Sequence, residues 1–252
     1  MKTTIITGAS AGLGLEFVRQ LEEAFPDVEQ VWLLARSGEK LRQAAGLLQR
    51  VRGKVLPLDL CAPEGLEKLA EELEREKPDV TLLVNNAGSG TLGNVGETPW
   101  MDQTRMVDLN VRALTGVSAL AVPYMHRGGH IINVSSISSF CPNPRMTVYS
   151  ASKAYVSAFS RGLGEELKNR GIVVTAVCTG PMATEFLDKA NITGNSKTFD
   201  RLPYCDPASV VRGSYAAAKQ GRAVHTPRAF YKFYRVVAKL LPQRLMILFT
   251  KA

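Results

Sequence analysis

The chain has 252 residues, of which 45% are hydrophobic and 21% are charged, so it is long enough to bury a substantial core. No stretch is rich enough in Gly, Ser or Pro to act as a linker, which favours one globular domain over residues 1–252. Strand-like sequence begins at Thr3, and no apolar run reaches the ~18 residues of a membrane span. The sequence therefore predicts a cytoplasmic protein without a signal peptide.

The cysteines and the charges narrow the class of protein further. The four cysteines stand far apart, with neither a CxxC pair nor a neighbouring histidine, so we expect reduced thiols and no metal site. The net charge is +8, and its excess lies at the C-terminal end, because no acidic residue follows Asp206. The basic residues after that point are Arg212, Lys219, Arg222, Arg228, Lys232, Arg235, Lys239, Arg244 and Lys251.

Short apolar runs alternate with longer amphipathic stretches along the chain. The runs, bounded by polar residues or glycine, are typical of strands that are buried on both faces. The predicted strands are Thr3–Thr7, Val31–Ala35, Lys54–Leu58, Val80–Val84, His130–Ser135 and Ile172–Cys178, with a short last strand at Ala223–His225. The predicted helices are Leu13–Phe25, Glu39–Val51, Pro63–Glu76, Trp100–Met125 and Val148–Asn169. This alternation predicts an α/β fold, a single Rossmann-type doubly wound parallel sheet with helices on both faces.

Three glycines follow the first predicted strand and open the first helix. Gly8, Gly12 and Gly14 stand where a backbone must turn sharply and bring its N–H groups close to a phosphate. The N-terminus of the helix adds a favourable dipole for the anion. We assign this turn, with Ser10 and Leu13 inside it, to a cofactor site; a tight turn without any ligand is the alternative.

The end of the second strand indicates which dinucleotide is bound. Proteins that prefer NAD usually place an acid here to hold the ribose hydroxyls. Ala35 leaves that place uncharged, and Arg36 can pair with a 2′-phosphate, with Ser10 and Ser37 as further hydrogen-bond donors. The pattern favours NADP(H) over NAD(H); the alternative is that Arg36 is a solvated loop charge.

Polar residues also follow the third and fourth strands. Asp59 and Leu60 end the third, and Asn86-Ala87-Gly88 ends the fourth. Both lie at carboxyl ends of strands, where open α/β sheets bind ligands. Either could be an Asx-type turn, but together with the glycine turn they describe the length of a dinucleotide.

Tyr149 and Lys153 lie four residues apart in a predicted helix, so their side chains share one face. A free phenol titrates near pH ~10 and exchanges protons poorly at neutral pH. A positive charge about 4 Å away, at an effective dielectric constant near ~20, is worth roughly 4 kcal/mol, or about three pKa units before desolvation is subtracted. The pair therefore predicts a phenol with a lowered pKa.

These motifs fall in the order and spacing of a known family. Ser136 stands thirteen residues before Tyr149, and Asn110 lies in Leu109-Asn110-Val111. From Thr3 to about His225 the chain resembles the short-chain dehydrogenase/reductase family. The resemblance implies an NADPH-dependent oxidoreductase that interconverts a ketone or aldehyde and an alcohol by hydride transfer.

The resemblance also implies a role for each of four side chains. Tyr149 exchanges a proton with the substrate oxygen, and Lys153 lowers the pKa of that phenol and contacts the nicotinamide ribose. Ser136 holds the carbonyl, for which Ser135 is the neighbouring candidate, and Asn110 supports a water in a proton relay. The competing interpretation is a dinucleotide-binding regulatory or membrane-surface protein whose site is vestigial.

The segment after the sixth strand resembles the family's turn beside the nicotinamide, with Thr179 in place of the usual proline. By resemblance, Gly180, Met182 and Thr184 contact the cofactor. The irregular stretch 182–207 is expected to form a lid over the substrate. The expected substrate wall is mostly apolar: Ser138, Phe140, Met146 and Phe186. It suits a 3-oxoacyl chain, a steroid or an aromatic ketone, although core packing explains such residues equally well.

The extension 227–252 predicts a basic amphipathic helix at Pro227–Leu241. Its expected apolar face comprises Phe230, Phe233, Tyr234, Val237, Leu240 and Leu241, with Lys232, Arg235 and Lys239 opposite. Such a helix makes weak contact with an anionic membrane surface, caps a neighbouring subunit or docks on its own domain. Nucleic-acid binding is not expected, because no base-reading module accompanies the basic residues.

Small residues line one side of the helix that carries Tyr149. Ala151, Ala154, Ala158 and Gly162 permit close contact with another helix. The resemblance implies a homodimer or homotetramer through this helix, whereas packing against the sheet would explain the same stripe.

Overall fold

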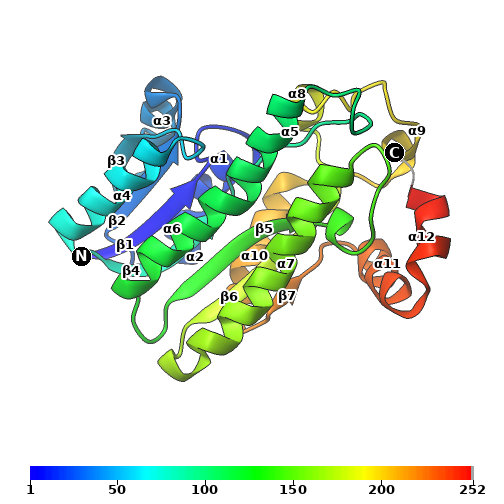
Figure 1. The fold of residues 1–252 in the computed structure, drawn as a ribbon. Helices are drawn as coiled ribbons and strands as arrows, with labels where there is room; N and C mark the ends of the chain where they lie inside the picture. The colour runs from blue at the N-terminus through cyan, green and yellow to red at the C-terminus, as the bar shows by residue number, and fades with distance from the viewer. Residues whose placement is uncertain (251–252) are drawn as a thin grey trace.

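The computed structural model describes residues 1–250, in which seven strands form one parallel sheet in the order β3-β2-β1-β4-β5-β6-β7 (Figure 1). The strands are β1 Lys2–Thr7, β2 Gln30–Ala35, β3 Arg52–Pro57, β4 Asp79–Asn85, β5 His130–Ser136, β6 Val173–Thr179 and β7 Val224–His225. The chain runs outward from β1 to β3 and then returns to place β4 on the other side of β1. Ligands of open α/β sheets bind where the strand order reverses in this way. The predicted doubly wound parallel sheet is confirmed.

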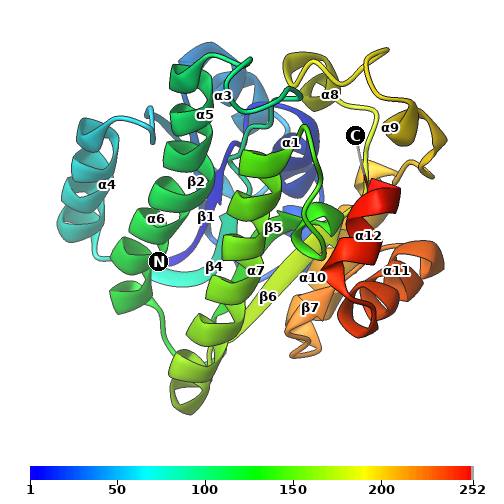
Figure 2. The same ribbon diagram turned by 45° about the vertical axis from the view of Figure 1, so that its right-hand side comes forward.

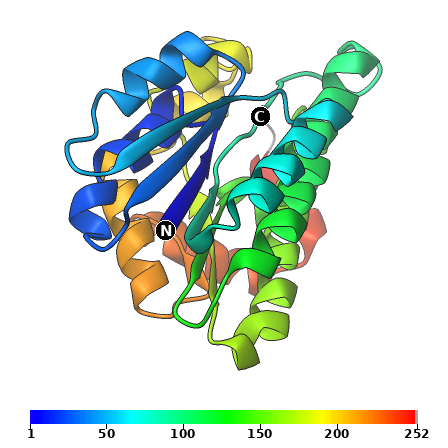
Figure 3. The ribbon, with the colours of Figure 1, turned by 90° about the vertical axis from the view of Figure 1, so that its left-hand side faces the viewer.

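Helices cover both faces of the sheet, as Figure 3 shows along the strands. One layer contains α1 Gly12–Arg19, α2 Leu21–Ala24, α3 Gly38–Ala45 and α10 Pro207–Lys219; the other contains α4 Pro63–Glu76, α5 Trp100–Val107, α6 Leu114–Ala121 and α7 Thr147–Leu167. Each layer packs against the strands and buries an apolar cluster, which includes Phe17 and Tyr215 on one face and Leu69 and Val117 on the other. The sheet is thus buried on both faces, as its apolar strands require.

The helix predicted over Glu39–Val51 is wrong in its second half, because α3 ends at Ala45. The carboxylate of Glu22 accepts the backbone N–H groups of Gln49, Arg50 and Val51, at 2.9, 2.7 and 2.8 Å. Those N–H groups are therefore unavailable for helical hydrogen bonds. The helix predicted over Leu13–Phe25 is likewise divided, between α1 and α2, at Gln20.

The helix predicted over Trp100–Met125 has a wider turn in its middle. A π-helical segment, Asp108–Ala113, joins α5 to α6, and Asn110 lies inside it. Such widened turns occur often at functional sites, where they reorient a side chain.

Two short helices and a helical hairpin complete the chain (Figure 2). The stretch 182–207 contains α8 Glu185–Lys189 and α9 Lys197–Arg201, and the C-terminal extension forms α11 Ala229–Leu240 and α12 Gln243–Thr250. Among residues 1–250, no helix combines the length and the apolar character needed to cross a bilayer.

Two sequence expectations about helix faces need correction. In α11 the fully buried side chain is Tyr231, whereas Phe230, Phe233 and Leu240 of the expected apolar face stay exposed. Packing against the sheet does not explain the small-residue stripe of α7, because Ala151, Ala154, Ala158 and Gly162 are all exposed.

Candidate active site

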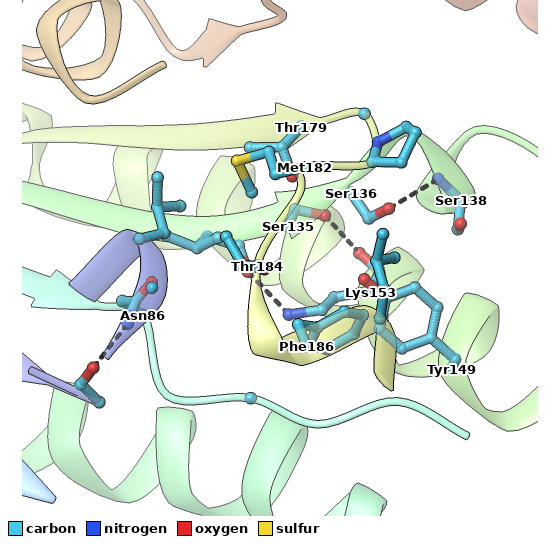
Figure 4. A pocket seen from close by; sticks show the side chains of 18 of the residues that line it. Asn86, Ser135, Ser136, Ser138, Tyr149, Lys153, Thr179, Met182, Thr184 and Phe186 are labelled. Carbon is cyan, nitrogen blue, oxygen red and sulfur yellow. Dashed lines mark hydrogen bonds between the residues drawn. The ribbon is translucent and has the colours of Figure 1, made fainter. Parts of the chain in front are cut away.

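A cavity lies at the carboxyl ends of β1, β4, β5 and β6, where the strand order reverses. Ser136 at the end of β5 and Tyr149 and Lys153 on α7 face it from one side (Figure 4). The glycine turn after β1 faces it from another side, and α8 of the 182–207 segment lies over it. A second hollow continues from this cavity toward the ends of β2 and β3. The two hollows share Gly8, Ala11, Ala87, Gly88, Phe186 and Lys189.

The glycine turn requires its glycines for backbone reasons. Gly8 and Gly12 have φ values of +66° and +52°, which residues with a Cβ rarely adopt. Gly14 serves packing, because a Cβ there would stand 2.0 Å from the carbonyl oxygen of Gly8. Gly14 does not line either hollow. No side chain caps the N-terminus of α1, whose N-cap residue is Ala11, so its first N–H groups are free to receive a pyrophosphate.

Asn86 and Thr7 fasten this turn to β4. The Asn86 amide donates to the carbonyl oxygens of Thr7 and Gly8, at 3.1 and 3.2 Å. The Thr7 hydroxyl accepts the backbone N–H groups of Asn86 and Ala87, each at 3.0 Å. Thr7 was not singled out in the sequence; its signal is a hydroxyl at the last strand position before the glycines.

The second hollow is lined by the residues expected to hold the adenosine half of a dinucleotide: Ser10, Arg36, Ser37, Asp59 and Leu60. Arg36 is exposed at its rim. The Ser37 hydroxyl accepts the N–H of Lys40 at 3.3 Å and so caps α3. Lys40, from the first turn of α3, and Lys189, from α8, add positive charge that sequence reasoning missed. Their signal would have been basic residues close to the glycine and lid segments.

Asp59 makes a structural turn and also lines the hollow. One carboxylate oxygen accepts the N–H of Cys61 at 3.0 Å, which is an Asx-type turn. The other pairs with the Arg105 guanidinium at 3.0 Å. Both interpretations of Asp59 thus have a geometric basis.

Tyr149 and Lys153 come from successive turns of α7 and are 8% and 6% exposed. The Lys153 ammonium lies 5.8 Å from the centre of the Tyr149 ring and donates to the carbonyl oxygen of Val134 at 2.9 Å. Burial raises the pKa of Tyr149 to about 12, which the hydrogen bond from Ser136 only partly offsets. Burial also lowers the pKa of Lys153 to about 8. The expectation of a lowered pKa for Tyr149 is wrong for this structure, because desolvation dominates and the Lys153 ammonium, 5.8 Å from the ring centre, does not offset it.

Ser135 and Ser136 differ in what their hydroxyls do. The Ser135 hydroxyl donates to the carbonyl oxygen of Lys153 at 2.9 Å and contacts the Ser157 hydroxyl at 2.8 Å. Ser136 instead lines the cavity beside Tyr149, whose pKa it lowers, and its hydroxyl accepts the N–H of Ser138 at 3.1 Å. Ser135 therefore supports α7, and the geometry favours Ser136 as the residue facing a substrate.

Asn110 lies behind the site and does not line the cavity. Its side-chain oxygen accepts the N–H of Ser89, and its amide donates to the carbonyl oxygen of Ser89, both at 2.9 Å. The amide also donates to the Ser152 hydroxyl at 3.0 Å. A Cβ added to Gly88 would meet the oxygen of Asn110 at 3.0 Å and the Lys153 nitrogen at 3.3 Å. Asn110 thus holds the Gly88–Ser89 backbone against Lys153.

The substrate wall expected from the sequence is brought together in part. Ser138, Met146 and Phe186 line the cavity, and the Phe186 ring lies 5.9 Å from that of Tyr149. The prediction that Phe140 belongs to this wall is wrong. The centre of its ring lies 6.0 Å from that of Tyr234 on α11, and Phe140 does not line the cavity. Leu187 and Phe199 complete the apolar wall from α8 and α9.

The turn after β6 is supported from the C-terminal extension. A Cβ on Gly180 would stand 2.3 Å from the Tyr231 ring, so glycine is required there. The N–H of Cys205 donates to the carbonyl oxygen of Pro181 at 2.8 Å. These contacts hold the turn that follows Thr179. Met182 and Thr184 follow it and line the cavity, with Thr184 opposite Gly12.

Comparisons with known proteins agree with this geometry. The model of the family described as short chain dehydrogenase matches residues 2–194. An uncharacterized oxidoreductase of Staphylococcus aureus (strain USA300) is 29% identical over 198 residues, which cover 78% of this chain and 84% of the relative. The very-long-chain 3-oxoacyl-CoA reductase of Anas platyrhynchos is 34% identical over 191 residues, covering 72% of this chain and 60% of that protein. The structure of a short-chain dehydrogenase from Sphingobium yanoikuyae in complex with NADPH superimposes with a TM-score of 0.80 at 27% identity, covering 96% and 97% of the two chains.

Proposed function

Because this chain belongs to the short-chain dehydrogenase family, we propose that it uses NADPH to reduce an apolar ketone or aldehyde to its alcohol. The family makes it an NAD(P)-dependent oxidoreductase with a fold that binds a nicotinamide dinucleotide. The proposal adds the preference for NADPH, the apolar character of the substrate and the roles of the individual residues.

The observation that carries the proposal is one continuous hollow with two chemically different halves. Ser136, Tyr149 and Lys153 converge at one end, the uncapped N-terminus of α1 lies where the two hollows meet, and the basic residues lie at the other end. A dinucleotide bound with its adenosine in the second hollow and its nicotinamide in the cavity would have the nicotinamide beside the Tyr149 phenol. When bound, that ring supplies the hydride for the carbonyl carbon.

The protein's own groups would then orient the carbonyl and supply the proton. Ser136 and Tyr149 both line the cavity, and Ser136 lowers the pKa of the phenol, so a carbonyl oxygen placed beside them can receive a hydrogen bond from both hydroxyls. With its pKa raised to about 12, Tyr149 is protonated at neutral pH and is ready to act as the general acid of a reduction. The buried Lys153 ammonium would stabilise the phenolate that remains.

Positive charge around the second hollow supports NADPH over NADH. Arg36 and Lys40 line it, and Ala35 provides no acid that would repel a 2′-phosphate. A phosphate held by an arginine and a lysine makes charge-assisted hydrogen bonds, which are about twice as strong as neutral ones. The Sphingobium neighbour is a complex with NADPH, which agrees with this choice for the present chain.

The apolar wall supports a hydrophobic carbonyl substrate. Met146, Phe186, Leu187 and Phe199 face the cavity near Tyr149. Such a wall stabilises an apolar substituent beside the carbonyl. The name of the Anas relative, a very-long-chain 3-oxoacyl-CoA reductase, agrees with a 3-oxoacyl compound as one candidate, besides steroids and aromatic ketones.

The test is consumption of NADPH, and separately of NADH, with a panel of apolar and polar ketones. We expect turnover with NADPH and an apolar ketone. Tyr149→Phe should lower kcat by roughly 10²–10⁴ because it removes the general acid, while NADPH affinity changes by no more than a few-fold.

Tyr155→Phe is the matched control, since Tyr155 lies on the same helix with its hydroxyl on Thr115, at 2.7 Å, away from the cavity. Undiminished turnover in Tyr149→Phe would remove Tyr149 from the mechanism. Nucleotide binding without turnover of any ketone or alcohol would favour the vestigial-site alternative.

We further propose a homodimer or homotetramer in the cytoplasm. The small side chains of the α7 stripe are exposed, so a second copy can approach this helix closely. The four cysteines are free thiols, which agrees with a reducing compartment.

A further inference from the structure

The C-terminal hairpin exposes an apolar surface of unusual extent. Phe233, Val236 and Leu240 on α11 are 69%, 54% and 75% exposed, and Leu245 and Leu248 on α12 are 49% and 73% exposed. Single exposed apolar side chains are common, but a cluster on two adjoining helices marks an interaction surface. Figures 1 and 2 show α11 and α12 together at one end of the molecule, outside the two helical layers.

The orientation of α11 is fixed by its buried side. Tyr231 is 0% exposed, its ring packs against Gly180, and its hydroxyl donates to the carbonyl oxygen of Pro203 at 2.8 Å. Phe233 and Leu240 follow Tyr231 by two and nine residues, which places them about 200° and 180° around the helix from it. The apolar stripe therefore points away from the protein and cannot be buried by a rotation of α11 that keeps Tyr231 in place.

Positive charge borders this stripe. Lys232 and Lys239 are exposed and lie seven residues apart, so they share one side of α11 next to Phe233 and Leu240. No acidic residue occurs anywhere after Asp206. A helix whose outward-facing apolar stripe is flanked by a row of lysines has the side chains of one that lies in a membrane interface.

We propose that the α11–α12 hairpin docks on the surface of an anionic lipid bilayer. Phe233, Val236 and Leu240 enter the boundary between headgroups and acyl chains, and Lys232 and Lys239 contact anionic headgroups. Charge decides against a second copy of the chain, because two hairpins meeting face to face would bring their lysines together without an acidic partner. A nucleic-acid backbone would match the lysines but leave the apolar stripe in water.

Docking would also bring the substrate loop to the bilayer. On α12, Met246 is buried, and the Thr250 hydroxyl donates to the carbonyl oxygen of Pro142 at 3.0 Å. Pro142 belongs to the loop between β5 and α7, whose Ser138 and Met146 line the cavity. This consequence rests on the proposed function: an apolar carbonyl compound dissolved in lipid would reach the cavity from the side that faces the membrane.

The experiment is co-sedimentation of the full chain with vesicles of phosphatidylcholine alone and with vesicles of phosphatidylcholine and phosphatidylglycerol in equal amounts. We expect binding to the anionic vesicles that weakens with added salt, and much weaker binding to the neutral ones. Phe233→Ser combined with Leu240→Ser should reduce the partition coefficient about 100-fold, roughly tenfold for each side chain withdrawn from the interface. The control is Trp100→Ser combined with Met101→Ser, which removes apolar groups of similar exposure, 72% and 62%, from α5 at another end of the molecule.

Three results would overturn the inference. The first is that the wild-type chain does not sediment with anionic vesicles, and the second is that the Phe233/Leu240 variant binds them as well as the wild type does. The third is that light scattering gives a lower molecular mass for that variant than for the wild type. The last result would assign the stripe to a second copy. Turnover of a water-soluble ketone by the same variant at the wild-type rate shows that its fold is intact. If no ketone is turned over by any form, the proposed function fails, while vesicle binding still decides the docking surface.

Discussion

Burial acts in opposite directions on the two titratable side chains of the candidate site. It raises the pKa of Tyr149 to about 12 and lowers that of Lys153 to about 8, because the low-dielectric surroundings disfavour the charged form of each. The sequence places the ammonium within one helical turn of the phenol but does not reveal how little water reaches either group. The shared helix face of the two side chains could therefore be predicted from their spacing, whereas the desolvation that sets both pKa values required the fold.

These pKa values predict different pH dependences for the two directions of the reaction. Alcohol oxidation needs the phenolate, whose population rises about tenfold per pH unit below a pKa of about 12. Carbonyl reduction needs the neutral phenol, which predominates throughout that range. We expect kcat/KM for oxidation to increase from neutral pH to about pH 8 and then level off, and that for reduction to stay level and then fall above about pH 8, because both directions lose the Lys153 ammonium there. Initial rates in both directions with one ketone–alcohol pair test this, and an oxidation profile that is flat over the same range would contradict it.

At the scale of elements, the sequence predicts strands and helices well where the periodicity of apolar residues is strong. It predicts them poorly where a contact with a residue distant in the chain determines the backbone conformation. Every predicted strand is present, because short apolar runs rich in β-branched residues and bounded by polar residues favour strands buried on both faces. The second half of the helix predicted over Glu39–Val51 failed because Glu22, from another helix, holds that backbone. Phe140 was assigned to the substrate wall because it lies near Tyr149 in the chain, but Tyr234, almost a hundred residues later, binds its ring.

The docking of α11 gives a prediction of its own, since one side chain joins this helix to the cofactor turn. Tyr231→Ala should lower the free energy of unfolding by about 3–5 kcal/mol, as expected for a fully buried aromatic side chain, and raise KM for NADPH because Gly180 loses its support. Tyr231→Phe removes only the hydrogen bond to Pro203 and should cost about 1 kcal/mol. Urea unfolding of both variants measures these differences.

The neighbouring Phe230 supplies the control for this series. It lies on the same helix but is 52% exposed and contacts only the edge of Tyr231, with ring centres 5.2 Å apart, so Phe230→Ala should lower the free energy of unfolding by about 0.5–1.5 kcal/mol, well below the loss in Tyr231→Ala. Equal losses of stability in Tyr231→Ala and Phe230→Ala would show that α11 is not held by its buried side.

At the scale of the whole molecule, two exposed surfaces lie on different elements and call for different partners. The stripe Ala151, Ala154, Ala158 and Gly162 on α7 is small and uncharged, which suits another helix, while the hairpin stripe is large, apolar and bordered by lysines. The sequence showed the composition of the α7 stripe, but on α11 it predicted Val237 for the apolar face, whereas the structure exposes Val236. Which side of each helix faces the sheet could not be read from it, because Tyr231 and the buried serines of α7 decide that orientation.

The α7 stripe predicts how the chain assembles. Ala158→Arg places a long charged side chain where two copies of α7 would meet, so we expect the mass in solution to fall from that of a dimer or tetramer to that of a smaller species. The folded monomer should tolerate the change, because the position is exposed and arginine is nearly as good a helix former as alanine. Light scattering after size exclusion gives the mass, and Ala223→Arg, an alanine exposed beside β7, is the matched control. If Ala158→Arg keeps the wild-type mass, the copies meet at another surface. In either case we expect vesicle binding through the hairpin to be unchanged, because the two surfaces are separate.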